Sequence, residues 1–408
     1  MEPKIRLKGF SGEWETHSLS EYFKKVTEKN TKMEYSVVLT NSAEYGVIPQ
    51  SDFFDHAIAN DKNIGGYYVV SPDDFVYNPR VSVTAPVGPI NRSSLCYIGV
   101  MSPLYLVFKI NGINKDYLNI FYKTNKWHKF MKLEGNCGAR FDRLSISDEQ
   151  FVKMPLVHPS DFNEQQEIAD YFKSLDSLIQ STTKKIESLK KVKAASLLTL
   201  FPQEGEKAPR VRFKGFKSEW VKVPLSTFAK KSTEKNGAMN YTITLTNSAE
   251  HGVVNQRDFF DHDISNDENI HGYYVIHNDD FVYNPRISST APVGPISRNQ
   301  LGYSGVMSPL YLIFKVEGID KNFLSYFFKT MLWHNYMKYE GNTGARFDRL
   351  AISDTQFFNM PIIMPIQENE QKAIANYFTS LDSQINLQTQ RLEKLKQIKS
   401  ACLDNMFV

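Results

Sequence analysis

Hydrophobic residues follow two distinct patterns along this chain of 408 residues. Residues 35–108 hold short runs of β-branched and aromatic residues interrupted by glycine, proline, asparagine and aspartate, which is typical of twisted strands joined by turns. Residues 115–132 carry apolar side chains at helical spacing and are followed by Gly135-Asn136, so we expect one helix there. Together these elements predict an α+β globular domain.

A long helix follows the predicted domain. Residues 163–201 contain neither glycine nor proline, and their apolar residues alternate at spacings of four and three, which keeps one seam facing a partner helix. At 1.5 Å per residue, about 38 residues span about 57 Å, so the helix extends beyond its own domain. The nearest partner is an equivalent helix at the end of the chain, and we expect the two to form an antiparallel coiled coil. The predicted helix-pairing residues are Ile168, Phe172, Leu175, Ile179, Ile186 and Leu189, with Ile374, Phe378, Leu381, Ile385, Leu392 and Leu395.

The sequence contains the same unit twice. Residues 4–202 align with residues 210–408 at a constant offset of 206, without insertion or deletion, and about 117 of the 199 aligned positions are identical. The runs DDFVYNPR, TAPVGPI, MSPLYL and GARFDRL occur unchanged in both copies. We therefore expect two similar domains related by pseudo-two-fold symmetry. Simple bivalency is the alternative meaning of such a duplication.

Length and repeat together set the domain organisation, since a chain of this size suggests two or three domains. The predicted parts are a first domain at 1–160, a central helix at 161–202, a linker at 203–209, a second domain at 210–366 and a C-terminal helix at 367–408.

Composition narrows the class of protein. A hydrophobic content of 41% with 23% charged residues excludes disordered and collagen-like chains. Three cysteines without metal-ligand spacing exclude a disulfide framework, and no stretch of about 18 apolar residues occurs, so we expect a cytoplasmic protein. A net charge of +3 does not by itself indicate nucleic acid.

Three repeated motifs carry a family resemblance. The first is K/R-x-R-L/F-K-G-F-x-x-E-W at 4–14 and 210–220, and the second is Met154-Pro155-Leu156 before the helix. The third is the helix start, E-Q-x-x-I-A-x-x-F, at 164–172 and 370–378. With this order of domains and helices, the chain resembles the specificity subunits of type I restriction-modification systems over essentially its full length.

The resemblance implies different roles for the domains, the helices and the partner subunits. Two target-recognition domains would each read half of a split DNA sequence, and the paired helices would fix the spacing between the halves. The partners implied are double-stranded DNA, two methyltransferase (modification) subunits and restriction/translocase subunits. The resemblance implies no catalysis and no cofactor in this chain, with S-adenosylmethionine, ATP and Mg on the partner subunits.

Independent catalysis has little support in the residues. The repeated turn Tyr77-Asn78-Pro79-Arg80 is similar to the Asn-Pro-Pro-aromatic loop of adenine methyltransferases, but it lacks the second proline and the stacking aromatic residue. No glycine-rich donor-binding loop precedes it. Repeated histidines such as His128 lack further ligands at metal-binding spacing, so no metal site is expected.

Loop residues retained in both copies are the candidates for DNA contact, because arginine binds guanine edges or phosphate and loops on a rigid scaffold often bind ligands. An internal salt-bridged turn is the alternative for the Arg140 to Arg143 stretch. Amides and carboxylates near Asn41 and Gln50, with their repeats, stay unranked. The predicted DNA-binding residues are Asn78, Arg80, Arg92, Arg140 and Arg143, with Asn284, Arg286, Arg298, Arg346 and Arg349.

Three functions therefore compete. The leading prediction is a non-catalytic DNA-specificity subunit whose two similar domains read a near-palindromic bipartite target. The alternatives are a DNA methyltransferase or nuclease with its own active site, and a pseudo-symmetric scaffold that binds only proteins.

Overall fold

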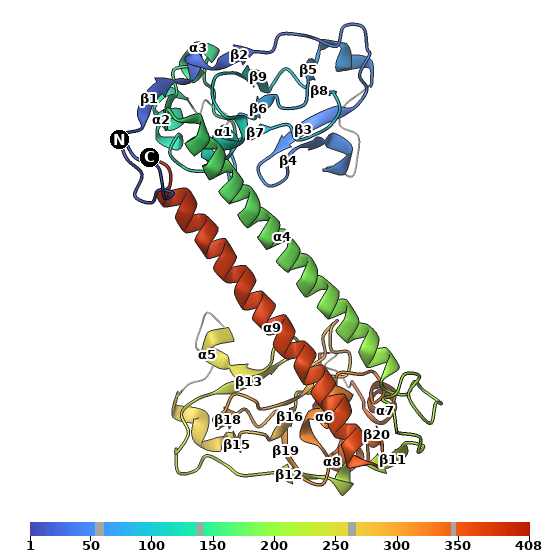
Figure 1. The fold of residues 1–408 in the computed structure, drawn as a ribbon. Coiled ribbons are helices and arrows are strands. Elements are labelled where there is room, and N and C mark those ends of the chain that lie inside the picture. The colour runs from blue at the N-terminus through green and yellow to red at the C-terminus, as the bar shows by residue number, and fades with distance from the viewer. Residues whose placement is uncertain (54–60, 137–141, 260–266, 344–347) are drawn as a thin grey trace. The chain divides into compact units, whose positions relative to one another are not determined.

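A computed structural model describes residues 1–53, 61–136, 142–259, 267–343 and 348–408 (Figure 1). The chain divides into two compact units. Unit 1 comprises Met1–Thr183 and Gln390–Val408, and unit 2 comprises Lys184–Thr389. Within the described residues, no helix is long and apolar enough to cross a membrane.

Unit 1 contains short strands, three short helices and parts of both long helices. The strands are β1 (Glu15–Ser18), β2 (Phe23–Lys25), β3 (Val38–Ser42), β4 (Gly46–Pro49), β5 (Tyr68–Val70), β6 (Phe75–Tyr77), β7 (Ile90–Arg92), β8 (Gly99–Met101), β9 (Leu106–Ile110) and β10 (Pro155–His158). The helices are α1 (Lys115–Phe121), α2 (His128–Glu134), α3 (Asp148–Phe151) and the long α4 (Phe162–Thr199).

Unit 2 has the same order of elements, except that the helix α5 stands where unit 1 has a 3₁₀ helix at Gln50–Asp52. Its strands are β11 (Val221–Pro224), β12 (Ala229–Ser232), β13 (Leu245–Ser248), β14 (Gly252–Asn255), β15 (Tyr274–Ile276), β16 (Phe281–Tyr283), β17 (Ile296–Arg298), β18 (Gly305–Met307), β19 (Leu312–Val316) and β20 (Pro361–Met364). Its helices are α5 (Gln256–Phe259), α6 (Lys321–Phe327), α7 (His334–Glu340), α8 (Asp354–Phe358) and the long α9 (Glu368–Asn405).

The strands form small twisted sheets. In unit 1, β2-β9-β6-β7 is antiparallel throughout, whereas β4-β3-β8-β5 contains one parallel pair, β3 with β8. Unit 2 has the corresponding sheet β12-β19-β16-β17. In both four-stranded antiparallel sheets two phenylalanines lie opposite each other, Phe75 with Phe108 and Phe281 with Phe314. Such cross-strand aromatic pairs stabilise the register.

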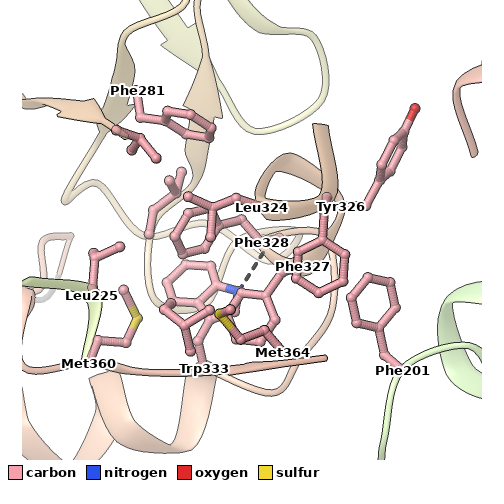
Figure 2. Close-up of a cluster of buried hydrophobic side chains, with 14 of the residues drawn as sticks. Phe201, Leu225, Phe281, Leu324, Tyr326, Phe327, Phe328, Trp333, Met360 and Met364 are labelled. Atoms are coloured by element: carbon pink, nitrogen blue, oxygen red, sulfur yellow. Dashed lines mark hydrogen bonds between the residues drawn. The ribbon is translucent and has the colours of Figure 1, made fainter. Parts of the chain in front are cut away.

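An aromatic core joins each sheet to its helices. Figure 2 shows the unit 2 core, in which the buried indole of Trp333 donates a hydrogen bond of 3.1 Å to the carbonyl of Phe328. Trp127 makes the same bond to Tyr122, at 3.3 Å, in unit 1. A buried indole needs such a partner because an unpaired polar group away from water is costly.

The prediction of one helix over residues 115–132 is wrong. The structure has two short helices, α1 and α2, with a turn at 122–127 between them. The hydroxyl of Thr124 donates to the carbonyl of Phe121 at 2.7 Å, and the indole of Trp127 donates to Tyr122, so side chains bond the carbonyls where the helix stops. Trp127, at the end of this turn, is buried in the core.

The long helices match the predicted ones, and the end of each lies in the unit of the other copy. Met406 and Phe407, just beyond α9, are buried in the core of unit 1, and Leu200 and Phe201, just beyond α4, in that of unit 2. Equivalent hydrogen bonds hold the two ends, from Ile5 N to Asn405 O and from Val211 N to Thr199 O, both 3.0 Å.

Within each unit the two helix segments run antiparallel. In unit 1, Tyr171 lies beside Cys402 and Asp176 pairs with Lys399, so the numbering rises on one segment as it falls on the other. In unit 2, Lys193 pairs with Asp382.

Candidate nucleic-acid interface

The repeated Tyr-Asn-Pro-Arg turn is held to the neighbouring strand by its asparagine. In unit 2, Asn284 donates to the carbonyl of Asn247 at 3.0 Å and accepts from the backbone amide of Arg286 at 3.0 Å. Asn78 makes the same two bonds in unit 1, at 2.9 and 3.0 Å. These asparagines, predicted to contact DNA, therefore shape the turn that presents the following arginine.

A glycine packs against this turn. Gly294 has a φ of +80°, and a Cβ built there would lie 2.1 Å from the carbonyl oxygen of Asn284; Gly88 stands in the same relation to Asn78. Only glycine tolerates both the left-handed backbone and this close approach. The glycine of the TAPVGPI run thus packs against the backbone of the Tyr-Asn-Pro-Arg turn.

The turn brings two predicted arginines together. Arg286 and Arg349 are opposite each other in an antiparallel bridge, and Arg80 and Arg143 are opposite each other in unit 1. The bridge is flanked in unit 2 by the hydrogen bond from Leu350 N to Pro285 O, at 2.9 Å. Side chains directly opposite across an antiparallel pair point to the same face. Two guanidinium groups from distant parts of the sequence therefore share one surface in each unit.

These two arginines line a hollow of about 500 Å³ in unit 2, which we call the arginine hollow. Tyr311 lies in its wall, and its hydroxyl is 3.0 Å from the hydroxyl of Thr246. Leu310 is 57% exposed at its rim. The lining residues are Thr246, Asn247, Ser248, Ala249, Gln256, Asn284, Pro285, Arg286, Ile287, Ser288, Pro295, Ser308, Leu310, Tyr311 and Arg349.

The arginine hollow is nearly invariant between the two copies. Fourteen of its 15 lining residues have an identical residue 206 positions earlier, the exception being Ile287, which aligns with Val81. Over the whole alignment only about 117 of 199 positions are identical. The surface around Arg286 and Arg349 has therefore changed less than the chain as a whole.

Electrostatics leave this surface positive. Arg286 and Arg80 are exposed, and neither guanidinium has an ion pair with a described residue. The Nε atom of Arg349 is 3.8 Å from the carboxylate of the adjacent Asp348, a long contact that solvent screens. Cationic side chains beside amide and hydroxyl groups form a surface that can bind phosphate or read base edges.

Two other predicted arginines bond within their own domain. Arg92 pairs with Asp116 at 2.7 Å and Asp73 at 3.5 Å, and Arg298 donates to Asp279 at 2.9 Å. Asp73 and Asp279 have left-handed φ values of 69° and 72°, so the arginines stabilise a turn that favours glycine. DNA contact by Arg92 and Arg298 stays a prediction, and this geometry favours a structural role. Arg140 and Arg346 lie outside the described residues.

Sequence reasoning did not single out Tyr311 and Leu310 as members of the arginine hollow. Tyr311 and Leu310, with Tyr105 and Leu104 in the first copy, come from the MSPLYL run, whose exact repetition was the available signal. Asn247, an unranked candidate for base contact, is buried and donates to the carbonyls of Val282 and Pro295. The Asn247 side chain therefore makes hydrogen bonds inside the domain.

Metal-binding clusters are not seen among the residues that the structure describes. No group of three histidine, cysteine, aspartate or glutamate side chains is placed to hold a metal ion in these parts of the chain. Burial lowers the pKa of His128 and of His334, which favours their neutral form as packing groups.

The predicted pairing residues of the long helices are buried or half-buried, and their pairing with one another stays a prediction. Phe172 contacts Phe407 and Phe378 contacts Phe201, with ring centroids 6.0 and 6.2 Å apart. Buried members are Ile168, Phe172, Leu175, Ile186, Ile374, Phe378 and Leu381, and half-buried members are Ile179, Leu189, Ile385, Leu392 and Leu395. The first residues of each helix also enter the core of the adjoining domain.

Comparison with known proteins identifies the family. The model of the type I restriction modification DNA specificity domain matches twice, at residues 11–191 and 217–397. The chain belongs to this family, whose members are the non-catalytic, DNA-recognising subunits of type I restriction-modification systems. It is thus a specificity subunit that acts on DNA in a complex with other subunits of the system.

Solved structures share the fold at low sequence identity. The type I restriction-modification S subunit from M. genitalium is 11% identical, with a TM-score of 0.56 over 100% of this chain and 99% of that one. The HsdS subunit from Thermoanaerobacter tengcongensis is 15% identical, with a TM-score of 0.50 over 97% and 96%. A chain from a study of complex assembly and conformational transition of the type I R-M system is 12% identical, with a TM-score of 0.51 over 97% and 98%. A search of curated protein sequences gave no match.

Proposed function

We propose that each domain reads its half of the DNA target through the surface built around one arginine pair, Arg286 with Arg349 in unit 2 and Arg80 with Arg143 in unit 1. The observation that carries this proposal is the arginine hollow, whose lining is retained at 14 of 15 positions between the copies. Gln256 and Tyr311 add groups that can meet base edges, and Leu310 offers an apolar contact.

The near identity of the two surfaces supports similar half-sites. A bidentate arginine contact favours guanine, and the same arginines on the same backbone favour the same base. The target is therefore a split, nearly inverted repeat with an unread spacer. The long antiparallel helix segments would set that spacer.

The partners follow from the family. Two methyltransferase subunits, with S-adenosylmethionine, would dock on this chain, and restriction/translocase subunits would supply ATP- and Mg-dependent cleavage. The domains would extend over 1–160 and 210–366, and the protein would work in the cytoplasm, where it meets cellular DNA.

Arg286→Ala and Arg80→Ala test the reading surface. The target is first identified by mapping methylated adenines in cells with and without this chain. Affinity for the mapped duplex is then measured at one fixed salt concentration. Loss of a bidentate contact costs about 1 to 3 kcal/mol, or about 5- to 150-fold in affinity per half-site.

The matched control is Arg210→Ala, which removes the same charge from an exposed arginine paired with Glu206. It should leave the discrimination between cognate and scrambled duplexes as in the wild type. Equal binding of the cognate duplex by wild-type protein and by the Arg80→Ala/Arg286→Ala variant would contradict the proposal.

A further inference from the structure

A second hollow in unit 2 shares the junction of β14 and α5 with the arginine hollow. It has a volume of about 350 Å³, and Thr242, Thr244, Asn255 and Arg257 are the polar residues among the seven that line it. Gln256, which lines the arginine hollow, stands between Asn255 and Arg257 in sequence and donates its backbone amide to the carbonyl of Thr244 at 2.9 Å. The junction of β14 and α5 therefore contributes to both hollows, and Arg257 lies beside the proposed DNA surface.

The two hollows differ in how many of their lining residues are identical in the first copy. Five of the seven residues that line the second hollow are changed in the first copy, against one of 15 for the arginine hollow. The polar residues are among those changed: Val38, Pro49 and Ser51 stand where unit 2 has Thr244, Asn255 and Arg257. The first copy thus lacks the positive charge and the amide at this place.

The backbone after position 255 also differs from the backbone after position 49 in the first copy. The side-chain carbonyl of Asn255 accepts a hydrogen bond of 3.1 Å from the backbone amide of Arg257, at the first turn of α5. Proline has no such acceptor, and in unit 1 the segment after Pro49 is a short 3₁₀ helix at Gln50–Asp52. Asn255 therefore fixes the turn from which the exposed Arg257 side chain extends.

We propose that Arg257, positioned by Asn255, reads one base pair in the second half-site for which the first domain has no reader. This inference rests on the proposed function and deepens it. The guanidinium offers five donors in a planar fork that suits a guanine edge, whereas the short hydroxyl of Ser51 offers one. The target therefore departs from a perfect inverted repeat at one position of the second half-site.

Reciprocal exchange between the copies tests the inference in the full-length protein with its methyltransferase. One variant is Asn255→Pro with Arg257→Ser, and the other is Pro49→Asn with Ser51→Arg. Binding is measured to a library of duplexes in which each half-site position is randomised in turn. The first variant should lose about 5- to 150-fold discrimination at a single position of the second half-site and keep every preference in the first. The second variant should gain a preference at the mirror position.

Arg257→Lys keeps the charge and removes the bidentate fork, so it should lose most of the same discrimination while the fold stays intact. Unchanged base preferences in Asn255→Pro/Arg257→Ser and in Arg257→Lys would overturn the inference. A loss of affinity equal for all sequences, with the salt dependence reduced by about one ion, would overturn it as well, since that is the behaviour of a phosphate contact.

Failure of the broader proposal gives a different result. If the Arg80 and Arg286 variants bind the cognate duplex like the wild type, the arginine hollow is not the reading surface, whatever the library shows for Arg257.

Discussion

A buried ion pair joins the start of each long helix to the first residues of its copy. Removing this ion pair in unit 2 by Arg212→Ala is a well-defined perturbation of the fold. Arg212 donates from Nε and Nη2 to the two carboxylate oxygens of Glu370, at 2.6 and 2.7 Å. The side chain of Glu370 is 2% exposed and that of Arg212 is 15% exposed. Arg6 and Glu164 repeat this arrangement in unit 1, at 2.7 and 2.8 Å.

The magnitude of the Arg212→Ala effect follows from what the substitution leaves behind. The only other side-chain donor to the Glu370 carboxylate among the described residues is the Trp220 indole, at 3.4 Å. A buried carboxylate that loses its cation costs about 3 to 5 kcal/mol. Arg212→Lys keeps a charge without the bidentate geometry and should cost less. Adding Glu370→Gln to Arg212→Ala should recover part of the loss, because a buried amide is cheaper than a buried charge.

Native-state hydrogen exchange of the backbone amides in β11 and in the first turns of α9 is the appropriate assay, because it reports local opening free energies in a chain with two units. Arg210→Ala is the control, since its ion pair with Glu206 is exposed and should leave these free energies nearly unchanged. A decrease of less than about 1 kcal/mol for Arg212→Ala, or one no larger than that of Arg210→Ala, would refute the reasoning.

Three further predictions concern the helices and the pH dependence of stability. Leu175→Asp with Leu381→Asp places carboxylates at positions 6% and 7% exposed, so methylation should no longer be confined to one spacer length; retention of a unique spacer would show that the helix pair does not set it. A chain of residues 1 to about 205 should form a homodimer in which Leu200 and Phe201 take the places of Met406 and Phe407; a monomer in sedimentation experiments would contradict this. Burial lowers the pKa of His158 below its usual 6.5, so the unfolded chain binds the proton more readily and stability falls as the pH drops below about 6.5. His158→Met, which copies Met364 of the second copy, should weaken that dependence in urea unfolding at pH 5 to 7.5, and an identical pH profile would exclude His158 as its source.

The long helices could be predicted from the sequence because one strong signal determines them. A stretch of 38 residues without glycine or proline has no competing local structure, and α4 accordingly runs from Phe162 to Thr199. The break between α1 and α2 had no such signal. Thr124 and Trp127 fit a helix by spacing, and only the tertiary demand to bury the indole makes the chain turn there.

The arginines of the proposed reading surface could be predicted from the sequence, but their arrangement could not. Repetition singled out Arg286 and Arg349, yet 63 positions separate them, and nothing in that spacing indicates the bridge that sets them opposite each other. Repetition equally singled out Arg298. Its ion pair with Asp279 depends on the left-handed backbone of Asp279, which could not be predicted from the sequence. Retention in both copies therefore identifies residues that matter to the domain without separating those that bind DNA from those that shape it.

The equal length of the two long helices, 38 residues each, has a physical reason in the exchanged helix ends. Each unit takes part of its core from the chain just beyond the other copy's helix, with Phe201 against Phe378 in unit 2 and Phe407 against Phe172 in unit 1. One residue inserted into α4 after Lys193 would turn Leu200 and Phe201 by about 100° and advance them by 1.5 Å relative to the ion pair of Lys193 with Asp382, so that the two contacts with unit 2 could not both be kept. Loops tolerate insertions because their ends stay in place, whereas these helices must match in length and phase at both ends. Within the long helices, substitution is therefore an easier route of divergence than insertion. The differences at Asn255 and Arg257 lie outside these helices, in the second hollow.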